Sequence, residues 1–186
     1  MSINDLYKIL LSDKPSIKIK NNEEELFELI PELEKCKGFN QNNDWHIYDV
    51  YEHILHVVDY VDNDIILRLA ALFHDIGKPL VYTEDINGIG HFYGHWIKSQ
   101  DIFLLFALNH NIDEDIRCVV SNLILYHDKN MGKLNDNELK HILELFDYDG
   151  IELLFNLKRA DLLAQNSKYH YLLNDCEEQK KKILLK

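Results

Sequence analysis

The chain has 186 residues, a length that suits one domain with a substantial hydrophobic core. Hydrophobic residues make up 46% of it, which excludes a disordered chain. Its net charge of −12 disfavours an extended nucleic-acid surface, because phosphate backbones are bound by basic patches. Cys36, Cys118 and Cys176 are far apart and form no CxxC pair, so we expect a reduced chain without disulfides. The sequence offers neither a signal peptide nor a run of 18 apolar residues, so we expect no membrane span and a cytoplasmic protein.

The first 45 residues are predicted to be a helical extension. Residues 4–11 have the pattern of a short helix that ends in the Ser12–Pro15 segment. A second helix is expected to begin after Asn22, because three glutamates follow this typical N-cap residue. Pro31 is expected to kink that helix. We therefore expect residues 1–45 to pack on the rest of the chain rather than form a second domain.

From residue 46 onwards the sequence predicts further helices and almost no strand. Apolar residues at helical spacing favour helices over 48–61, 64–77, 95–109, 113–127, 136–146, 149–161 and from about 168 onwards. Asp64, Asp113 and Asp136 are expected to be N-caps. Asn87-Gly88 indicates a short hairpin within a loop. The fold class is therefore predicted to be all-α, in three parts: an N-terminal extension (1–45), a core (46–166) and a C-terminal helix (167–186).

The stretch LRLAALFHDIGKP, at residues 67–79, is the most informative in the chain. Apolar residues recur at helical spacing up to His74, and the helix is expected to stop at Gly77 because Pro79 follows. Adjacent helical residues point about 100° apart. His74 and Asp75 can therefore bind two different atoms, or the carboxylate can span two atoms.

Other predicted helices carry further histidine and aspartate residues that could complete a metal site. The candidates for one site are His53, His74, Asp75 and Asp161. Two carboxylates would balance one divalent cation and lower the cost of burying its charge. Adding His95 and His127 makes room for a second ion, with Asp75 as the bridge. We therefore expect one or two divalent ions (Mn, Co, Ni, Zn, Mg or Fe), because imidazole and carboxylate together suit such metals better than calcium.

The same residues resemble a known family. The H…HD…D pattern is similar to that of the HD-domain metal-dependent phosphohydrolase superfamily, and more similar still to the HD domain of bacterial tRNA nucleotidyltransferases (CCA-adding enzymes) and poly(A) polymerase-like proteins. The stretches that carry the resemblance are 46–59, 67–79, 90–95 and 157–165. The resemblance identifies the core over 46–166 as a helical HD domain. Nothing upstream offers the length of a nucleotidyltransferase domain, so we expect a stand-alone HD protein that does not add nucleotides.

The resemblance also implies roles for individual residues. It assigns metal binding to His53, His74, Asp75 and Asp161. The positions of His95 and His127 supply ligands in two-metal members of the superfamily and face the substrate phosphate in one-metal members.

Three further residues are candidates for substrate binding. Lys78 is a compact cation near the HD pair and would bind either a phosphate or Asp75. Asp75 and Lys78 are the candidates for catalysis. Arg159 would act in the same way or would form a surface ion pair. His91 lies in a glycine-rich loop and is a candidate contact for the substrate.

The sequence therefore predicts a phosphatase or phosphodiesterase. It would cleave a phosphomonoester or cyclic phosphodiester of a nucleotide or related small molecule, with metal-bound water or hydroxide as the nucleophile. Two alternatives stay open: a di-iron oxygenase built on the same ligand set, and a non-catalytic HD module that binds nucleotide, RNA or a protein. The expected partner is a small phosphorylated substrate, and homodimer formation is left open.

Overall fold

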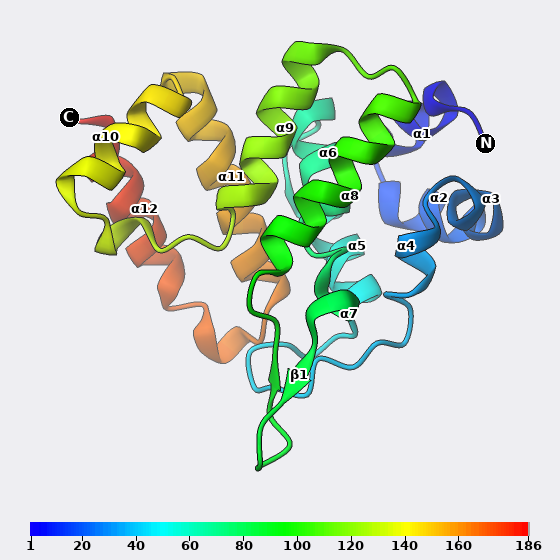
Figure 1. Ribbon diagram of the computed structural model, residues 1–186, viewed down its shortest axis with the longest axis horizontal. Helices are drawn as coiled ribbons and strands as arrows, with labels where there is room; N and C mark the ends of the chain where they lie inside the picture. The colour runs from blue at the N-terminus through cyan, green and yellow to red at the C-terminus, as the bar shows by residue number, and fades with distance from the viewer. Residues whose placement is uncertain (186) are drawn as a thin grey trace.

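The computed structural model describes residues 1–185, and α-helices account for nearly all of its regular structure (Figure 1). The predicted all-α class is confirmed. Position 186 of the predicted C-terminal segment lies outside the described residues. The elements are α1 (Ile3–Leu10), α2 (Pro15–Asn21), α3 (Glu23–Leu29), α4 (Pro31–Glu34), α5 (Val50–Tyr60), α6 (Ile65–Phe73), α7 (Lys78–Val81), β1 (Thr83–Glu84), β2 (Gly90–His91), α8 (His95–Asn109), α9 (Glu114–Tyr126), η1 (Met131–Lys133), α10 (Asp136–Leu145), α11 (Tyr148–Ala164), η2 (Ser167–Tyr169) and α12 (Leu172–Leu184).

Helix α6 forms the centre of the bundle. Every residue from Leu67 to Phe73 is buried, and a helix that is apolar on all sides needs neighbours all round. Helices α5, α8, α9 and α11 provide them, and α1 also contacts α6. Phe73 packs against Phe103 and Phe106 of α8, with ring centroids 5.3 and 5.0 Å apart. The HD pair therefore follows directly from the most buried helix of the fold.

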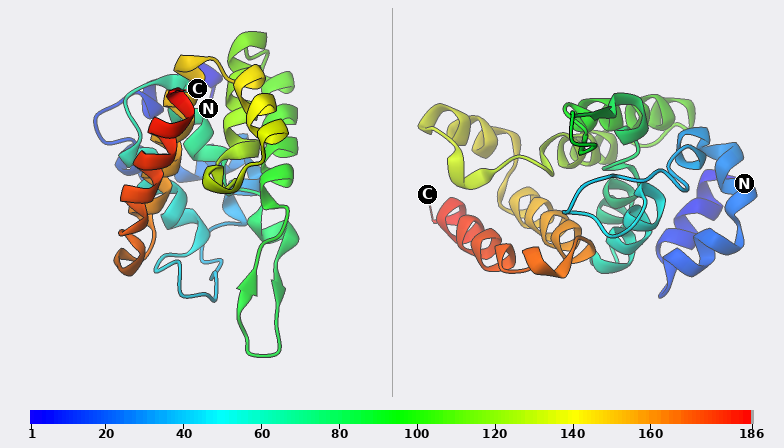
Figure 2. Two further views of the ribbon diagram at one scale, coloured as in Figure 1. Left: turned by 90° about the vertical axis from the view of Figure 1, so that its left-hand side faces the viewer. Right: turned by 90° about the horizontal axis from the view of Figure 1, so that it is seen from below.

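The remaining helices lie at the two ends of the bundle. Helices α1–α4 are at one end and α10 and α12 at the other (Figures 1 and 2). Helix α2 packs on α5, and α12 packs on α11. None of the helices within residues 1–185 is both long enough and apolar enough to cross a bilayer.

Two prolines act differently from the sequence prediction. Pro15 lies in the first turn of α2, where proline is tolerated because no intrahelical N–H bond is needed. The sequence analysis missed this helix. Pro31 likewise begins α4 after α3 has ended, instead of kinking one helix. Asn22 flanks α3, but its side chain donates to the carbonyl of Lys18 rather than capping.

Of the other expected caps, two are right and one is wrong. Asp64 and Asp113 accept hydrogen bonds from the first turns of α6 and α9. Helix α10 is capped by Asn135, which forms a capping box with Glu138, and Asp136 is the first helical residue. The prediction of Asp136 as the cap was wrong because Asn135 is an equally good cap residue with a glutamate three positions later.

Helix α6 ends earlier than expected, and Gly77 has another role. The last helical residue is Phe73, His74 is the C-cap, and α7 begins at Lys78. Gly77 has φ −81°, so it is not a left-handed cap. A Cβ at this position would lie 2.6 Å from the backbone N of Ser99 and 2.8 Å from the carbonyl O of His95. Glycine is therefore needed because the start of α8 approaches the HD turn closely.

The predicted hairpin is present and projects beyond the helical body (Figure 2, left). Strands β1 and β2 are antiparallel, with Glu84 opposite Gly90. The N–H of Gly90 also donates to the carbonyl of Asn42, and the Asn42 amide donates to the hydroxyl of Tyr82. The loop before α5 is thereby held against the hairpin, and Gln41 of this loop is buried.

Candidate metal centre

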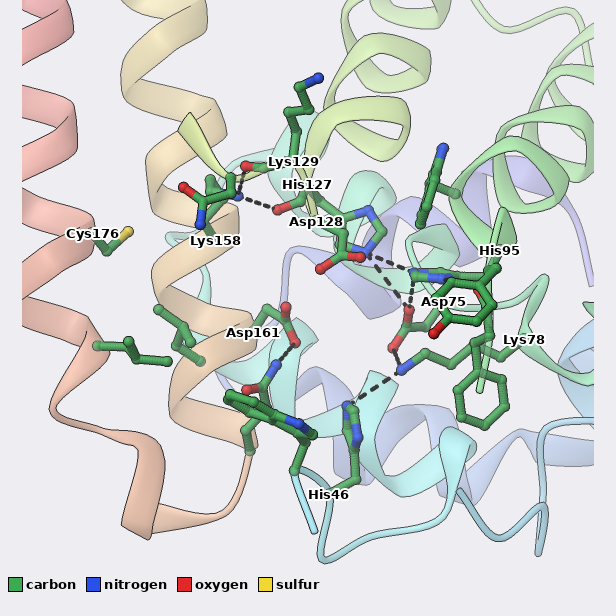
Figure 3. Close-up of a pocket in the computed structure, with 18 of the residues that line it drawn as sticks. His46, Asp75, Lys78, His95, His127, Asp128, Lys129, Lys158, Asp161 and Cys176 are labelled. Carbon is green, nitrogen blue, oxygen red and sulfur yellow. Dashed lines mark hydrogen bonds and ion pairs between the residues drawn. The ribbon is translucent and has the colours of Figure 1, made fainter. Parts of the chain in front are cut away.

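The residues predicted as ligands converge at one place in the bundle. They come from the middle of α5, the end of α6, the first turn of α8, the C-cap of α9 and the inner face of α11. Figure 3 shows four of them: Asp75, His95, His127 and Asp161. All are buried except the last, whose side chain keeps 14% exposure. In chain order they are His53, His74 with Asp75, His95, His127 and Asp161.

Asp75 lies between two groups of imidazoles. Its Oδ2 is 3.3 Å from Nε2 of His53 and 3.2 Å from Nε2 of His74. Its Oδ1 is 3.1 Å from Nε2 of His95 and 3.7 Å from Nε2 of His127. The two oxygens of one carboxylate thus face two different sets of nitrogen atoms.

We name these sets the first and second clusters. The first cluster contains His53, His74 and Asp161, whose nearest donor atoms lie within 4.8 Å of one another, together with Oδ2 of Asp75. Its His53 Nε2 is 3.0 Å from Asp161 Oδ1. The second cluster contains His95, His127 and Oδ1 of Asp75. Each cluster has the nitrogen and oxygen donors that could hold one metal ion.

The backbone fixes the tautomer of three of these histidines. A carbonyl oxygen can only accept, so each Nδ1 must carry a proton, and in the neutral ring the lone pair is then on Nε2. The Nδ1 atoms of His74, His95 and His127 lie 2.8, 2.9 and 2.7 Å from the carbonyl oxygens three residues earlier, those of Ala71, Phe92 and Ile124.

In their neutral forms, His95 and His127 then face each other with the lone pairs of Nε2 inside the protein. The Nε2 atoms of His53 and His74 are 3.3 Å apart, as are those of His95 and His127. Asp75 Oδ1 is buried and has no hydrogen-bond donor among residues 1–185. Such an arrangement is unfavourable unless a cation lies between the donors. The donor set therefore fits divalent metal ions.

Both carboxyl groups are held in the ionised form. Burial alone would raise the pKa of Asp75, but the positive charges that His74 and Lys78 can carry hold that pKa well below its usual range. Burial likewise opposes the ionisation of Asp161, and the hydrogen bond from His53 lowers the pKa of Asp161 below its ordinary value. Charged carboxylates are the form that binds metal.

Lys78 is enclosed rather than free. Its Nζ lies 2.6 Å from Asp75 Oδ2, 2.8 Å from Gln41 Oε1 and 3.3 Å from His46 Nε2. Burial, followed by the Lys78 charge, lowers the pKa of His46 well below its ordinary value, so the neutral ring accepts from the ammonium. All three N–H groups of Lys78 are thus used within the protein. Gln41 gave no signal in the sequence, because it lies in a polar loop.

A cavity of about 550 Å³ opens over the two clusters. His91 lines it, with its ring stacked on that of Tyr93. Arg159 is exposed and does not line it, whereas Lys158 does. Arg159 is two residues from Asp161 and therefore on another side of α11, while Lys158 is three residues away on the same side. Of the two basic residues, the structure therefore places Lys158, which the sequence analysis did not name, at the cavity, and Arg159 away from it.

Fold and site together define a helical domain with a buried cluster of histidine and aspartate residues that could hold metal ions. The family model of the HD domain matches residues 43–161, well over half of the chain. The chain therefore belongs to the HD domain family, a superfamily of metal-dependent hydrolases.

The chain is also similar to curated proteins of known name. It is 36% identical over 72 residues to an A-adding tRNA nucleotidyltransferase of Deinococcus radiodurans, a match that covers 36% of this chain and 16% of that protein. It is 24% identical over 156 residues to a multifunctional CCA protein of Cupriavidus necator, covering 82% of this chain and 34% of the relative. The corresponding protein of Ralstonia nicotianae is 25% identical over 156 residues, covering 82% and 33%. The chain thus spans about a third of the length of these relatives, or less.

Proposed function

We propose that this protein is a two-metal phosphohydrolase that cleaves a phosphoester of a small molecule. The observation that carries the proposal is the position of Asp75, one oxygen of which faces each cluster. Divalent ions held there would polarise a phosphoryl oxygen and supply hydroxide at neutral pH. Membership of the HD family supports hydrolysis rather than the nucleotide addition named in the relatives.

The chain's own residues would position the reaction. Asp75 would bridge the two clusters, and the His–carbonyl hydrogen bonds would fix the direction of each Nε2 atom. Lys78 would hold Asp75 in its bridging orientation and balance its charge, since its ammonium is buried against that carboxylate. This differs from a free phosphate-binding lysine, which would need an unoccupied N–H group.

The cavity favours a nucleotide or a molecule of similar size. Its volume is within the roughly 300–1,000 Å³ range of small-molecule sites. Lys129 and Lys158 line it with cationic groups, and Trp45 and Trp96 add aromatic surfaces that suit a base. The net charge of −12 disfavours a long polyanion and is compatible with a small ligand that enters a local cationic site.

Metal analysis combined with activity assays tests the proposal. We expect close to two ions per chain in protein purified without chelator, and about one in His95→Ala. His110→Ala is the matched control, because His110 lies at the other end of α8, away from both clusters, and should leave two ions. The loaded wild type should hydrolyse aryl phosphates or cyclic nucleotides, and His95→Ala should lose most of that activity.

Other outcomes would contradict the proposal in distinct ways. One ion in both wild type and His95→Ala would leave a one-metal site, with His95 free for the substrate. Two irons with oxygen consumption and without phosphoester cleavage would establish the oxygenase instead. Absence of binding after addition of manganese, cobalt, nickel or zinc would leave a non-catalytic binding module.

A further inference from the structure

Lys158 links α11 to the end of the helix that carries His127. Its Nζ donates to the carbonyl oxygen of His127 at 2.5 Å and to that of Lys129 at 2.8 Å (Figure 3). It lies on α11 one turn before Asp161, the α11 residue of the first cluster. A single face of α11 therefore supplies a carboxylate to the first cluster and a cation to the segment that holds the second.

The two carbonyls that Lys158 contacts follow the last helical residue of α9 and need a hydrogen-bond donor from another segment. Helix α9 ends at Tyr126, and His127 is its C-cap. The Tyr126 carbonyl accepts from the N–H of Lys129, whereas no backbone N–H within residues 1–185 donates to the carbonyls of His127 and Lys129. A cation at a helix C-terminus also interacts favourably with the helix dipole. Lys158 supplies both a hydrogen-bond donor and a positive charge at this point.

Two anchors then determine where the His127 ring lies. Its carbonyl oxygen is held by Lys158, and its Nδ1 is held by the carbonyl of Ile124 at 2.7 Å. With the backbone and the ring of His127 both held, its Nε2 lies 3.3 Å from His95 Nε2 and 3.7 Å from Asp75 Oδ1. Loss of the backbone anchor would let the C-cap residue and the loop after it move away from the second cluster.

We infer that Lys158 is a positioning residue for the second metal ion. It acts through the backbone of His127 and makes no contact with Asp75. This inference rests on the proposed two-metal site. Lys158 should therefore affect the second cluster and leave the first, formed by His53, His74 and Asp161, largely as it is.

Four proteins test the inference: wild type, Lys158→Met, Lys158→Arg and Arg159→Met. The exposed Arg159 is the matched control, because its loss removes a neighbouring cation of the same helix that does not line the cavity. Manganese titration by calorimetry should give two sites in wild type. Lys158→Met should weaken one of them by about 10- to 100-fold, the usual effect of losing a residue that orients a ligand. Lys158→Arg should restore most of the affinity, and Arg159→Met should match wild type.

Amide hydrogen exchange on metal-free protein provides a second readout. Exchange at residues 127–130 should be faster in Lys158→Met and normal in Lys158→Arg, with α5 and α6 unchanged. If Lys158→Met does not fold, Lys158→Gln, which keeps an N–H donor without the charge, takes its place in both measurements.

The outcomes separate this inference from the proposed function. Two sites of unchanged affinity in Lys158→Met would overturn the inference alone. Unchanged metal binding with only a raised KM would also overturn it and make Lys158 a substrate contact. A wild type with fewer than two sites would overturn the two-metal proposal and this inference together.

Discussion

Gly77→Ala tests whether the turn after the HD pair fixes the start of α8. The added Cβ would lie 2.6 Å from Ser99 N, 2.8 Å from His95 O and 2.8 Å from Lys98 Cβ, and two of these atoms belong to the backbone. Overpacking of this kind costs about 1–3 kcal/mol. Weakening of the 3.0 Å hydrogen bond from Gly77 N to Ser99 Oγ adds about 1 kcal/mol. We therefore expect a loss of about 2–4 kcal/mol, or roughly 5–15 °C in Tm for a chain of this size.

Gly38→Ala is the matched control for this experiment. Gly38 has φ +72° with nothing within 4 Å of an added Cβ, so alanine there costs only backbone strain of about 1–2 kcal/mol. Thermal unfolding of the metal-free proteins, followed by circular dichroism, gives both Tm values. Because His95 is the first residue of α8, Gly77→Ala should also weaken the second metal site, and Gly38→Ala should not.

Two results would refute this reasoning. A Gly77→Ala protein within about 2 °C of wild type would show that α8 yields easily to the methyl group. A clear loss of stability with both metal sites intact would show that the position of His95 does not depend on this contact.

Two further predictions concern separate parts of the chain. Asp75→Asn keeps the shape of the side chain but removes the bridging charge, so metal analysis should show both ions bound at least about 100-fold more weakly. His91→Ala is the control and should retain both ions; loss of metal in this variant as well would point to general damage to the fold. The pKa of Asp5 is about 2, mainly because the Ser2 hydroxyl donates to it at 2.6 Å and secondarily because of Lys8. A lowered pKa contributes stability that is present above the unfolded value of 3.8 and is lost as the pH falls through about 2. Ser2→Ala should move the Asp5 pKa upwards in a carbon-13 NMR titration, and an unchanged value would assign the shift to Lys8 alone.

The helical class was predictable because it depends on local pattern, and the grouping of the six candidate ligands was predictable because the motifs that carry them resemble those of the HD family. Helical spacing on 67–74 places the HD pair after a buried helix whatever the rest of the chain does. The other candidates lie on the inner faces or at the ends of helices, positions that a helical period also marks. Their convergence is now visible in the structure, while their role as ligands stays a prediction.

The parts that the sequence analysis missed depend on contacts between distant segments. Gln41 reaches Lys78 from a loop 37 residues earlier in the chain. Lys158 donates to backbone carbonyls, which carry no side-chain signal at all. Gly77 lies in a motif typical of a helix end, but a side chain is excluded there by the backbone of α8, which follows only after the hairpin.

If the proposed function holds, the charge of the centre would explain how an acidic protein receives a phosphate. With neutral imidazoles, the carboxylates of Asp75 and Asp161 and the ammonium of Lys78 leave one net negative charge in the metal-free centre. A phosphate dianion would be repelled there, and the surrounding net charge of −12 adds to the repulsion. One divalent ion would reverse the sign, and two would leave three net positive charges next to the cavity. The buried Lys78 matters to this balance because it neutralises one of the two carboxylates. Attraction of the substrate should therefore depend more on the bound ions than on the lysines that line the cavity, so the overall charge of the chain is a poor guide to the ligand at its centre.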